Sequence, residues 1–326
     1  MRIIILLLLI CTSSTSFSQV LLEDKNGDVI VRNQFRKDDN VSLIKLNTGD
    51  QSLGFNYIKS TKNQDENNYL IHEFGIKAKP TEGYAAVFNS NQFSPGVKFS
   101  YALTKLRIFS ADIKSGFIDW ASVEFNYNIN KYTLYRSDTT FSNQFSSQSF
   151  KPLSFLLHYN YLIQKGDLAG KLLISAKAGY SRSSNFDDLR SVEIHDIKTI
   201  IDPATSTARQ IIKNRTGREG KYEEFDSYPL TLAITLLTQT DPRGSDEAKK
   251  LRLGFNGYIK SLATKINKPE TNAGVIFFLT RQDEKNGIRN PVFGLNIQAD
   301  DPFDVQDYNN GLQNRISIGF TSIFSL

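Results

Sequence analysis

Two neighbouring stretches of this chain alternate between apolar and polar residues over an unusual length. In residues 153–163 every odd position is apolar or aromatic, and Ser154, His158 and Asn160 stand among the even ones. Residues 172–181 repeat the pattern on the opposite parity. A period of two predicts β-strands, because successive Cβ atoms point to opposite faces. Strands in globular proteins average about 5–6 residues, whereas these two run to about 11–12.

The same alternation recurs along most of the chain. The further segments are 41–46, 53–58, 70–78, 97–104, 121–129, 228–236, 251–259, 275–279, 293–297 and 316–326. Three leucines, Leu156, Leu162 and Leu173, break the otherwise polar positions of the first two stretches. We therefore expect about twelve strands, with ten or fourteen as the alternatives.

The connections between these segments sort by length. Residues 165–170, 240–250 and 283–287 are short, polar and rich in turn formers, whereas 130–150 and 183–224 are long and are expected to be loops. Toward the C-terminus short and long links mostly alternate. Barrels of the outer membrane show this asymmetry, with tight periplasmic turns and long outer loops.

The N-terminus has the anatomy of an export signal. One arginine precedes an apolar run from Ile3 to Ile10, and small residues then lead to Ser18. We predict a signal peptide over residues 1–18; a lipoprotein cut at Cys11 is the alternative, although Ile10 is bulky for that cleavage. Cys11 is the only cysteine, so the mature chain has no disulfide. Residues 19–40 are expected to be a periplasmic segment or a short plug in a barrel lumen.

The facing pattern favours a membrane barrel. Each long strand is apolar on one face, and in a bilayer only helices and closed barrels satisfy every backbone polar group. With these segments, and a last strand ending Phe324-Ser325-Leu326, residues 41–326 resemble Gram-negative outer-membrane β-barrel proteins of no identified subfamily. Leu326 departs from the commonest terminal phenylalanine. The resemblance implies an all-β, antiparallel, up-and-down barrel in the outer membrane, with membrane lipid as its partner. The alternative is a secreted β-sandwich or soluble lipid-binding barrel, whose strands are shorter.

The charges of the chain are scattered. Its 39 basic and 34 acidic residues give a net charge of +5 without a basic patch, so a nucleic-acid partner is not expected. We find no metal-binding motif and no Gly-rich phosphate loop, and expect neither a metal nor a cofactor. His72 shares the apolar parity of its segment, which is an awkward place for a lipid-facing residue.

The polar parity predicts which residues line the lumen. The expected lumen-lining residues are Lys98, Glu124, His158, Asn160, Lys177, Arg252, Asn256, Lys260 and Arg315. Basic residues outnumber acidic ones in this set, and an excess of positive charge in a narrow lumen favours anions.

The sequence gives weaker evidence for a catalytic site than for a barrel lumen. His158 resembles the base of a barrel-wall phospholipase, but the serine two residues further on is missing. The pairs Asp187-Asp188 and His195-Asp196 both fall in the stretch 183–224, where a solvated loop is expected. Asp300, Asp301, Asp304 and Asp307 form an acidic cluster without the spacing of a calcium loop, so a solvated face is expected there too.

One connection is too apolar for a free loop. Residues 79–96 contain Tyr84, Val87, Phe88 and Phe93, which we expect to form a constriction or a docking segment. The first functional hypothesis is a channel or uptake protein for small, anionic solutes. The alternative is a non-transport barrel that acts as scaffold or accessory subunit of an outer-membrane complex, together with other membrane proteins. A barrel-wall hydrolase is the third hypothesis, and an enzyme is not our expectation.

Overall fold

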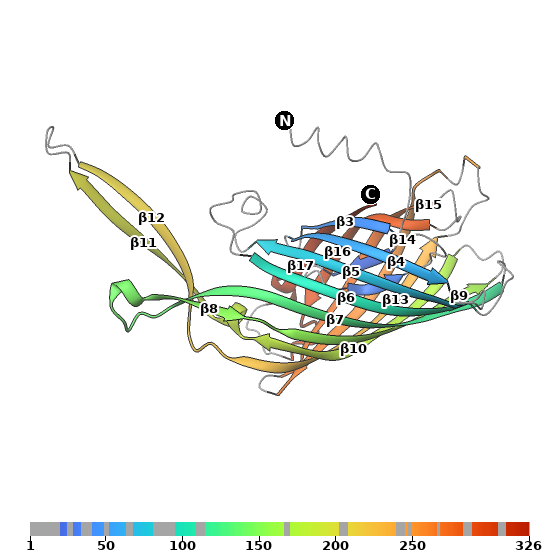
Figure 1. The fold of residues 1–326 in the computed structure, drawn as a ribbon, viewed down its shortest axis with the longest axis horizontal. Coiled ribbons are helices and arrows are strands. Elements are labelled where there is room, and N and C mark those ends of the chain that lie inside the picture. Colours follow the sequence, from blue (N-terminus) through green and yellow to red (C-terminus); the bar gives the residue numbers. More distant parts are fainter. Residues whose placement is uncertain are drawn as a thin grey trace.

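Twelve long strands form the body of the protein (Figure 1). The structure is a computed structural model that describes residues 20–24, 29–33, 41–48, 52–62, 68–80, 95–108, 115–165, 170–201, 208–238, 245–246, 249–265, 268–282, 289–305 and 311–325. The twelve strands are β3 (Val41–Asn47), β4 (Ser52–Lys62), β5 (Asn68–Pro80), β6 (Pro95–Ile108), β7 (Ser115–Tyr135), β9 (Leu153–Lys165), β10 (Gly170–Ser184), β13 (Glu224–Thr238), β14 (Arg252–Thr264), β15 (Glu270–Gln282), β16 (Arg289–Asp300) and β17 (Ile316–Ser325).

These strands close into an antiparallel barrel. The order runs β7-β6-β5-β4-β3-β17-β16-β15-β14-β13-β10-β9, and β9 pairs back to β7. The ring is closed by a seam between β3 and β17, in which Thr321 pairs with Asn47 and Ser325 with Leu43. The predicted fold class is confirmed, and each of the twelve alternating segments coincides with a barrel strand. We call the end where β3 begins and β17 ends the terminal rim, and the opposite end the arm rim.

The wall has an apolar outer face. Along β4, Phe55 is exposed while its neighbour Asn56 is buried, and the other strands alternate in the same way. On the outside of β4–β7, aromatic rings that include Phe74, Phe99 and Phe125 line a shallow hollow of about 480 Å³. Among the residues that the structure describes, no helix is long and apolar enough to span a membrane.

Two extensions rise from the arm rim. β7 continues past the barrel to pair with β8 (Phe145–Phe150), and β11 (Arg190–Ile201) pairs with β12 (Ala208–Glu219) in an antiparallel ribbon. This ribbon, which we call the arm, stands clear of the barrel in Figure 1. Short 3₁₀ helices lie at Phe141–Asn143, Phe186–Asp188 and Leu312–Arg315. The expectation of loops over 130–150 and 183–224 was therefore wrong for residues 130–135, 145–150, 190–201 and 208–219, because their backbone groups pair as strands.

A small hairpin lies inside the barrel. It is formed by β1 (Val20–Glu23) and β2 (Val29–Asn33), and its polar groups meet inward-facing side chains of the wall, as described below. Of the segment 19–40, the described residues thus occupy the lumen. The signal peptide predicted over residues 1–18 lies outside the described residues.

The half of the interior toward the terminal rim holds an apolar core. Ile30 of the hairpin is buried there with inward-facing residues of the wall, namely Leu43, Ile58, Tyr69, Ile71, Leu106, Trp120, Leu162, Leu173, Ala233, Tyr258, Ile276 and Phe278. Leu162 and Leu173 are cross-strand partners within this core. Two of the leucines that break the polar pattern of the sequence therefore do so because the lumen is packed at this end and is not polar throughout.

Glycines make room for the rings of this core. Gly254 pairs across strands with Phe278, and a Cβ on Gly254 would lie 2.1 Å from Cε2 of that ring. Gly274 stands in the same relation to Tyr258, with a Cβ 2.3 Å from the hydroxyl. An aromatic ring lying over a glycine of the next strand allows large side chains to fit inside a narrow barrel.

This packing predicts a difference between two glycines of β14. Gly254→Ala is expected to lower the free energy of unfolding by about 1–3 kcal/mol, because the ring of Phe278 must shift in a packed core. Gly257→Ala is the matched control, since a Cβ there meets its nearest atom at an ordinary 3.6 Å. Denaturant titration of both variants in detergent micelles measures the difference. Equal stabilities would contradict the packing of Phe278 over Gly254.

Candidate functional site

The half of the interior toward the arm rim holds a charged cluster. Lys45 on β3, Lys77 on β5 and Lys98 on β6 line one cavity together with Glu23 from the tip of the hairpin. Lys77 and Lys98 are direct cross-strand partners, and like charges in that position destabilise a sheet. The hairpin carboxylate compensates for them. The cavity holds about 30 Å³, roughly the volume of one water molecule.

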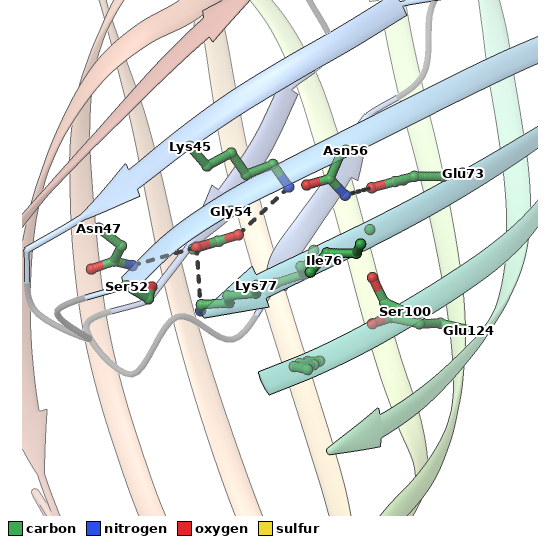
Figure 2. Close-up of a pocket in the computed structure, with 14 residues that line it drawn as sticks. Lys45, Asn47, Ser52, Gly54, Asn56, Glu73, Ile76, Lys77, Ser100 and Glu124 are labelled. Atoms are coloured by element: carbon green, nitrogen blue, oxygen red, sulfur yellow. Dashed lines mark hydrogen bonds and ion pairs between the residues drawn. The ribbon is translucent and has the colours of Figure 1, made fainter. Parts of the chain in front are cut away.

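Glu23 is held by side chains from two wall strands, and Figure 2 labels these partners, Lys45, Asn47 and Lys77. The Nζ atoms of Lys45 and Lys77 lie 3.6 and 3.9 Å from its carboxylate oxygens, and Asn47 Nδ2 donates to Oε2 over 3.4 Å. Burial alone would raise the pKa of Glu23, but Lys77 and Lys45 outweigh that effect and the pKa falls below its ordinary value. A lowered pKa means that this carboxylate stabilises the docked hairpin at neutral pH and that the contribution disappears as the pH falls through the lowered value.

The hairpin has three further polar anchors. Lys260 Nζ on β14 donates to Asp24 Oδ2 over 3.0 Å, and both groups are buried. Asn47 Nδ2 also donates to the backbone oxygen of Asp24, and Lys177 Nζ on β10 donates to the backbone oxygen of Val29 over 2.8 Å. The hairpin is thus bonded to the wall on opposite sides of the barrel.

A prediction follows for hairpin docking. Asp24→Asn removes the charge that Lys260 faces, and removing one partner of a buried ion pair costs about 3–5 kcal/mol. We expect the hairpin to detach while the barrel persists, so that trypsin cuts at Lys25 or Arg32 in the variant far faster than in the parent protein. Glu224→Gln is the control, because its ion pair with Arg182 lies at the exposed arm rim. Equal protection of the two variants would show that the ion pair does not hold the hairpin.

His158 lies in a second buried cluster. Its Nε2 is 2.9 Å from Glu124 Oε2, and both side chains are buried. Ser122 is the cross-strand partner of His158, although its Oγ shares a hydrogen bond of 2.6 Å with Thr104 Oγ1. Sequence reasoning missed this serine because it comes from the neighbouring strand. A substrate would have to reach groups at most 4% exposed, so the cluster fits a structural role in the interior better than hydrolysis.

The other predicted lumen residues also lie on inward positions. Asn160 and Asn256 are buried, and Asn256 Nδ2 donates to Thr235 Oγ1 over 2.6 Å. Arg252 is half-buried near the terminal rim. Lys45, Glu23 and Asp24 were missed. Lys45 could have been found from its parity between Ile44 and Leu46, whereas the two hairpin acids follow no strand pattern.

The acidic cluster near β16 is not a solvated face throughout. Asp301 is buried, with Oδ2 3.6 Å from Nη1 of Arg315, and the same nitrogen lies 2.9 Å from Asp304 Oδ1. Asp301 Oδ1 also accepts from the backbone N–H of Val305. The expectation was wrong for Asp301 because the inward-facing Arg315 of the neighbouring segment neutralises it. Asp307 lies outside the described residues.

The remaining sequence candidates are placed as follows. His72 is on the outer face, where its Nδ1 lies 2.9 Å from the hydroxyl of Tyr101, so the tyrosine gives it a polar partner. His195 is on the arm, and its Nδ1 lies 2.8 Å from Asn214 Oδ1. Tyr84, Val87, Phe88 and Phe93 lie outside the described residues. Within the described ranges, no group of three or more histidine, cysteine, aspartate or glutamate side chains is placed to hold a metal ion.

Comparison with known proteins adds no assignment: no protein-family model and no curated protein matches this sequence.

Proposed function

We propose that this chain is an outer-membrane β-barrel that serves as a scaffold or accessory subunit of a larger complex. In this proposal the barrel anchors the chain in lipid, and the arm is presented beyond the membrane. The packed interior is the observation that carries the proposal, because it favours an anchor over an open pore.

The outer wall supports a lipid environment. Exposed isoleucine, leucine or phenylalanine side chains project from every barrel strand except β3, where Ile44 and Leu46 are half-buried; examples are Phe74, Leu157 and Ile234. Tyr57, Tyr127 and Tyr228 also face outward, as expected for rings that can reach the interfaces. In water so large an apolar surface would be a liability, whereas in a bilayer it is the required surface.

The filled interior favours an anchoring role for the barrel. Toward the terminal rim it is filled by the apolar core around Trp120, and toward the arm rim the hairpin acids are bonded to the wall lysines. The cavity beside Glu23 is small, about 30 Å³, and the hairpin that borders it is bonded to the wall. A porin, by contrast, leaves an aqueous channel through a wider barrel.

Conductance in planar bilayers tests the proposal. We expect the purified full chain to insert without steady openings at low voltage, while a general porin added to the same membrane conducts. Insertion is verified separately by heat-modifiable gel mobility and by resistance to carbonate extraction. Steady openings of the inserted protein would overturn the scaffold reading, and release by carbonate would overturn the membrane location.

A gated anion channel is the second candidate, and one observation favours it. Lys45, Lys77 and Lys98 line one cavity with Glu23 of the hairpin and the wall acids Glu73 and Glu124. A displaced hairpin would therefore leave three lysines beside two acids, an excess of positive charge that favours an anionic solute. This candidate predicts that Glu23→Gln combined with Asp24→Asn produces anion-selective openings. Reversal potentials under a salt gradient measure the selectivity, and continued silence of the double variant would remove the candidate.

A further inference from the structure

The root of the arm is rigidly attached to the barrel. The ring of Tyr132 on β7 stacks on Phe186 with centroids 3.9 Å apart, and the guanidinium of Arg215 on β12 lies 4.0 Å above the ring of Phe145. Arg218 Nη1 donates to the backbone oxygen of Leu189 over 2.8 Å. Backbone pairing of β12 with the extension of β7 at Arg218 and Glu219 completes the attachment. The arm is therefore held in a set direction.

The distal part of the arm exposes apolar side chains on both faces. Ile197 and Ile212 are cross-strand partners on one face, and they are 59% and 60% exposed. Ile200 and Ile211 are exposed on the opposite face. A two-stranded ribbon alone is marginally stable in water, and exposed apolar side chains gathered at one place mark interaction sites. The attached root and the exposed isoleucines of the distal part together indicate a surface that binds a partner.

The charges of the two strands differ. β12 carries Arg209 and Lys213 in its distal part and Arg215 and Arg218 at its root, before its single acid, Glu219. On β11 the charges balance over the whole strand, and its distal part holds Lys198 and Asp196, the cross-strand partner of Lys213, so basic residues outnumber acidic ones toward the tip. In the described part of the chain, β12 pairs with β11 along one edge and with β7 only at its root. Its distal outer edge is thus both basic and open to a further strand.

The positive charge of this edge favours some binding partners over others. Basic side chains on an edge strand repel a second basic edge, so two copies of this chain are poorly suited to pair through β12. An acidic strand, in contrast, would gain backbone hydrogen bonds, electrostatic attraction and contact with the isoleucines.

We propose that the distal edge of β12 binds an acidic, extended segment of another exported protein as a third strand. The acidic side chains of that segment lie on the face of Arg209 and Lys213, and its alternate, apolar side chains cover Ile212 on the other face. This inference rests on the proposed scaffold role and names the chemistry of the partner.

Peptide binding to the full chain in detergent tests the inference. The probe is a short fluorescent peptide that alternates valine and glutamate, and the matched control alternates valine and lysine. Fluorescence anisotropy is expected to show saturable binding of the acidic peptide only, weakened by added salt. No binding of the acidic peptide, or equal binding of both peptides, would overturn the proposal.

Charge reversal locates the site. Arg209→Glu combined with Lys213→Glu is expected to weaken binding of the acidic peptide about tenfold and to admit the basic peptide, because two positive charges of the distal edge are reversed. Arg190→Glu at the root end of β11 is the control and should leave the affinity unchanged, because it lies far along the ribbon from Arg209 and Lys213. An unchanged peptide preference in the double variant would overturn the assignment to β12. Conduction by a protein that still binds the peptide would instead reject the scaffold role alone.

Discussion

Replacing Trp120 with alanine is expected to lower the free energy of unfolding by about 3–5 kcal/mol. Trp120 is 1% exposed inside the barrel, in the same core as Leu106, Leu162 and Leu173, and the loss of its ring leaves a cavity that β-strands locked in a closed ring cannot collapse to fill. Denaturant titration in lipid vesicles, followed by tyrosine fluorescence or gel mobility, measures the effect.

The matched variant is Phe125→Ala on the same strand. Phe125 faces outward and is 47% exposed, so the loss of its ring leaves no cavity in the core and the expected cost is small. If the two variants lost equal stability, the interior around Trp120 would not be a packed core, and the case for a filled barrel would fail.

Replacing Leu157 with arginine is expected to cost about 2–4 kcal/mol in lipid vesicles if the residue lies near the bilayer midplane. Leu157 is half-exposed on the outer wall of β9, so the guanidinium would enter hydrocarbon. The control is Ile197→Arg on the arm, where the side chain remains in water and no cost is expected. A soluble barrel would tolerate both changes alike, and that result would reject the membrane location.

The sequence predicted the barrel strands well because their pattern is simple. One face of each strand points out of the barrel and the other into it, so residue types alternate with a period of two along β9 and β10, with Leu156, Leu162 and Leu173 as the interruptions. It predicted the extensions poorly. β11 and β12 form a ribbon that is apolar on both faces near its tip, with Ile200 and Ile211 opposite Ile197 and Ile212, so no alternation signals a strand.

The sequence predicted which side chains face the interior, but not the groups that they bind there. Parity placed Lys177 and Lys260 on the inward side, yet it could not show that their partners are Val29 and Asp24 of a segment far away in the sequence. Pairing of this kind depends on tertiary placement, which short-range pattern does not encode. The same limit hid the contact between Glu124 and His158. Their strands, β7 and β9, are neighbours in the barrel, but β8 lies between them in the chain.

The seam between β3 and β17 has a consequence for the order of assembly. It joins the first and last strands of the barrel through residues 43–47 and 321–325, a short run beside the thirteen residue pairs of β5 and β6. Contacts so distant in sequence form late, because a long chain must be closed before they stabilise anything. The hairpin precedes β3 and ends up enclosed, so it must be in position when the seam shuts or else thread through a rim afterwards. We therefore expect the barrel wall to close late in folding, around a hairpin of the same chain.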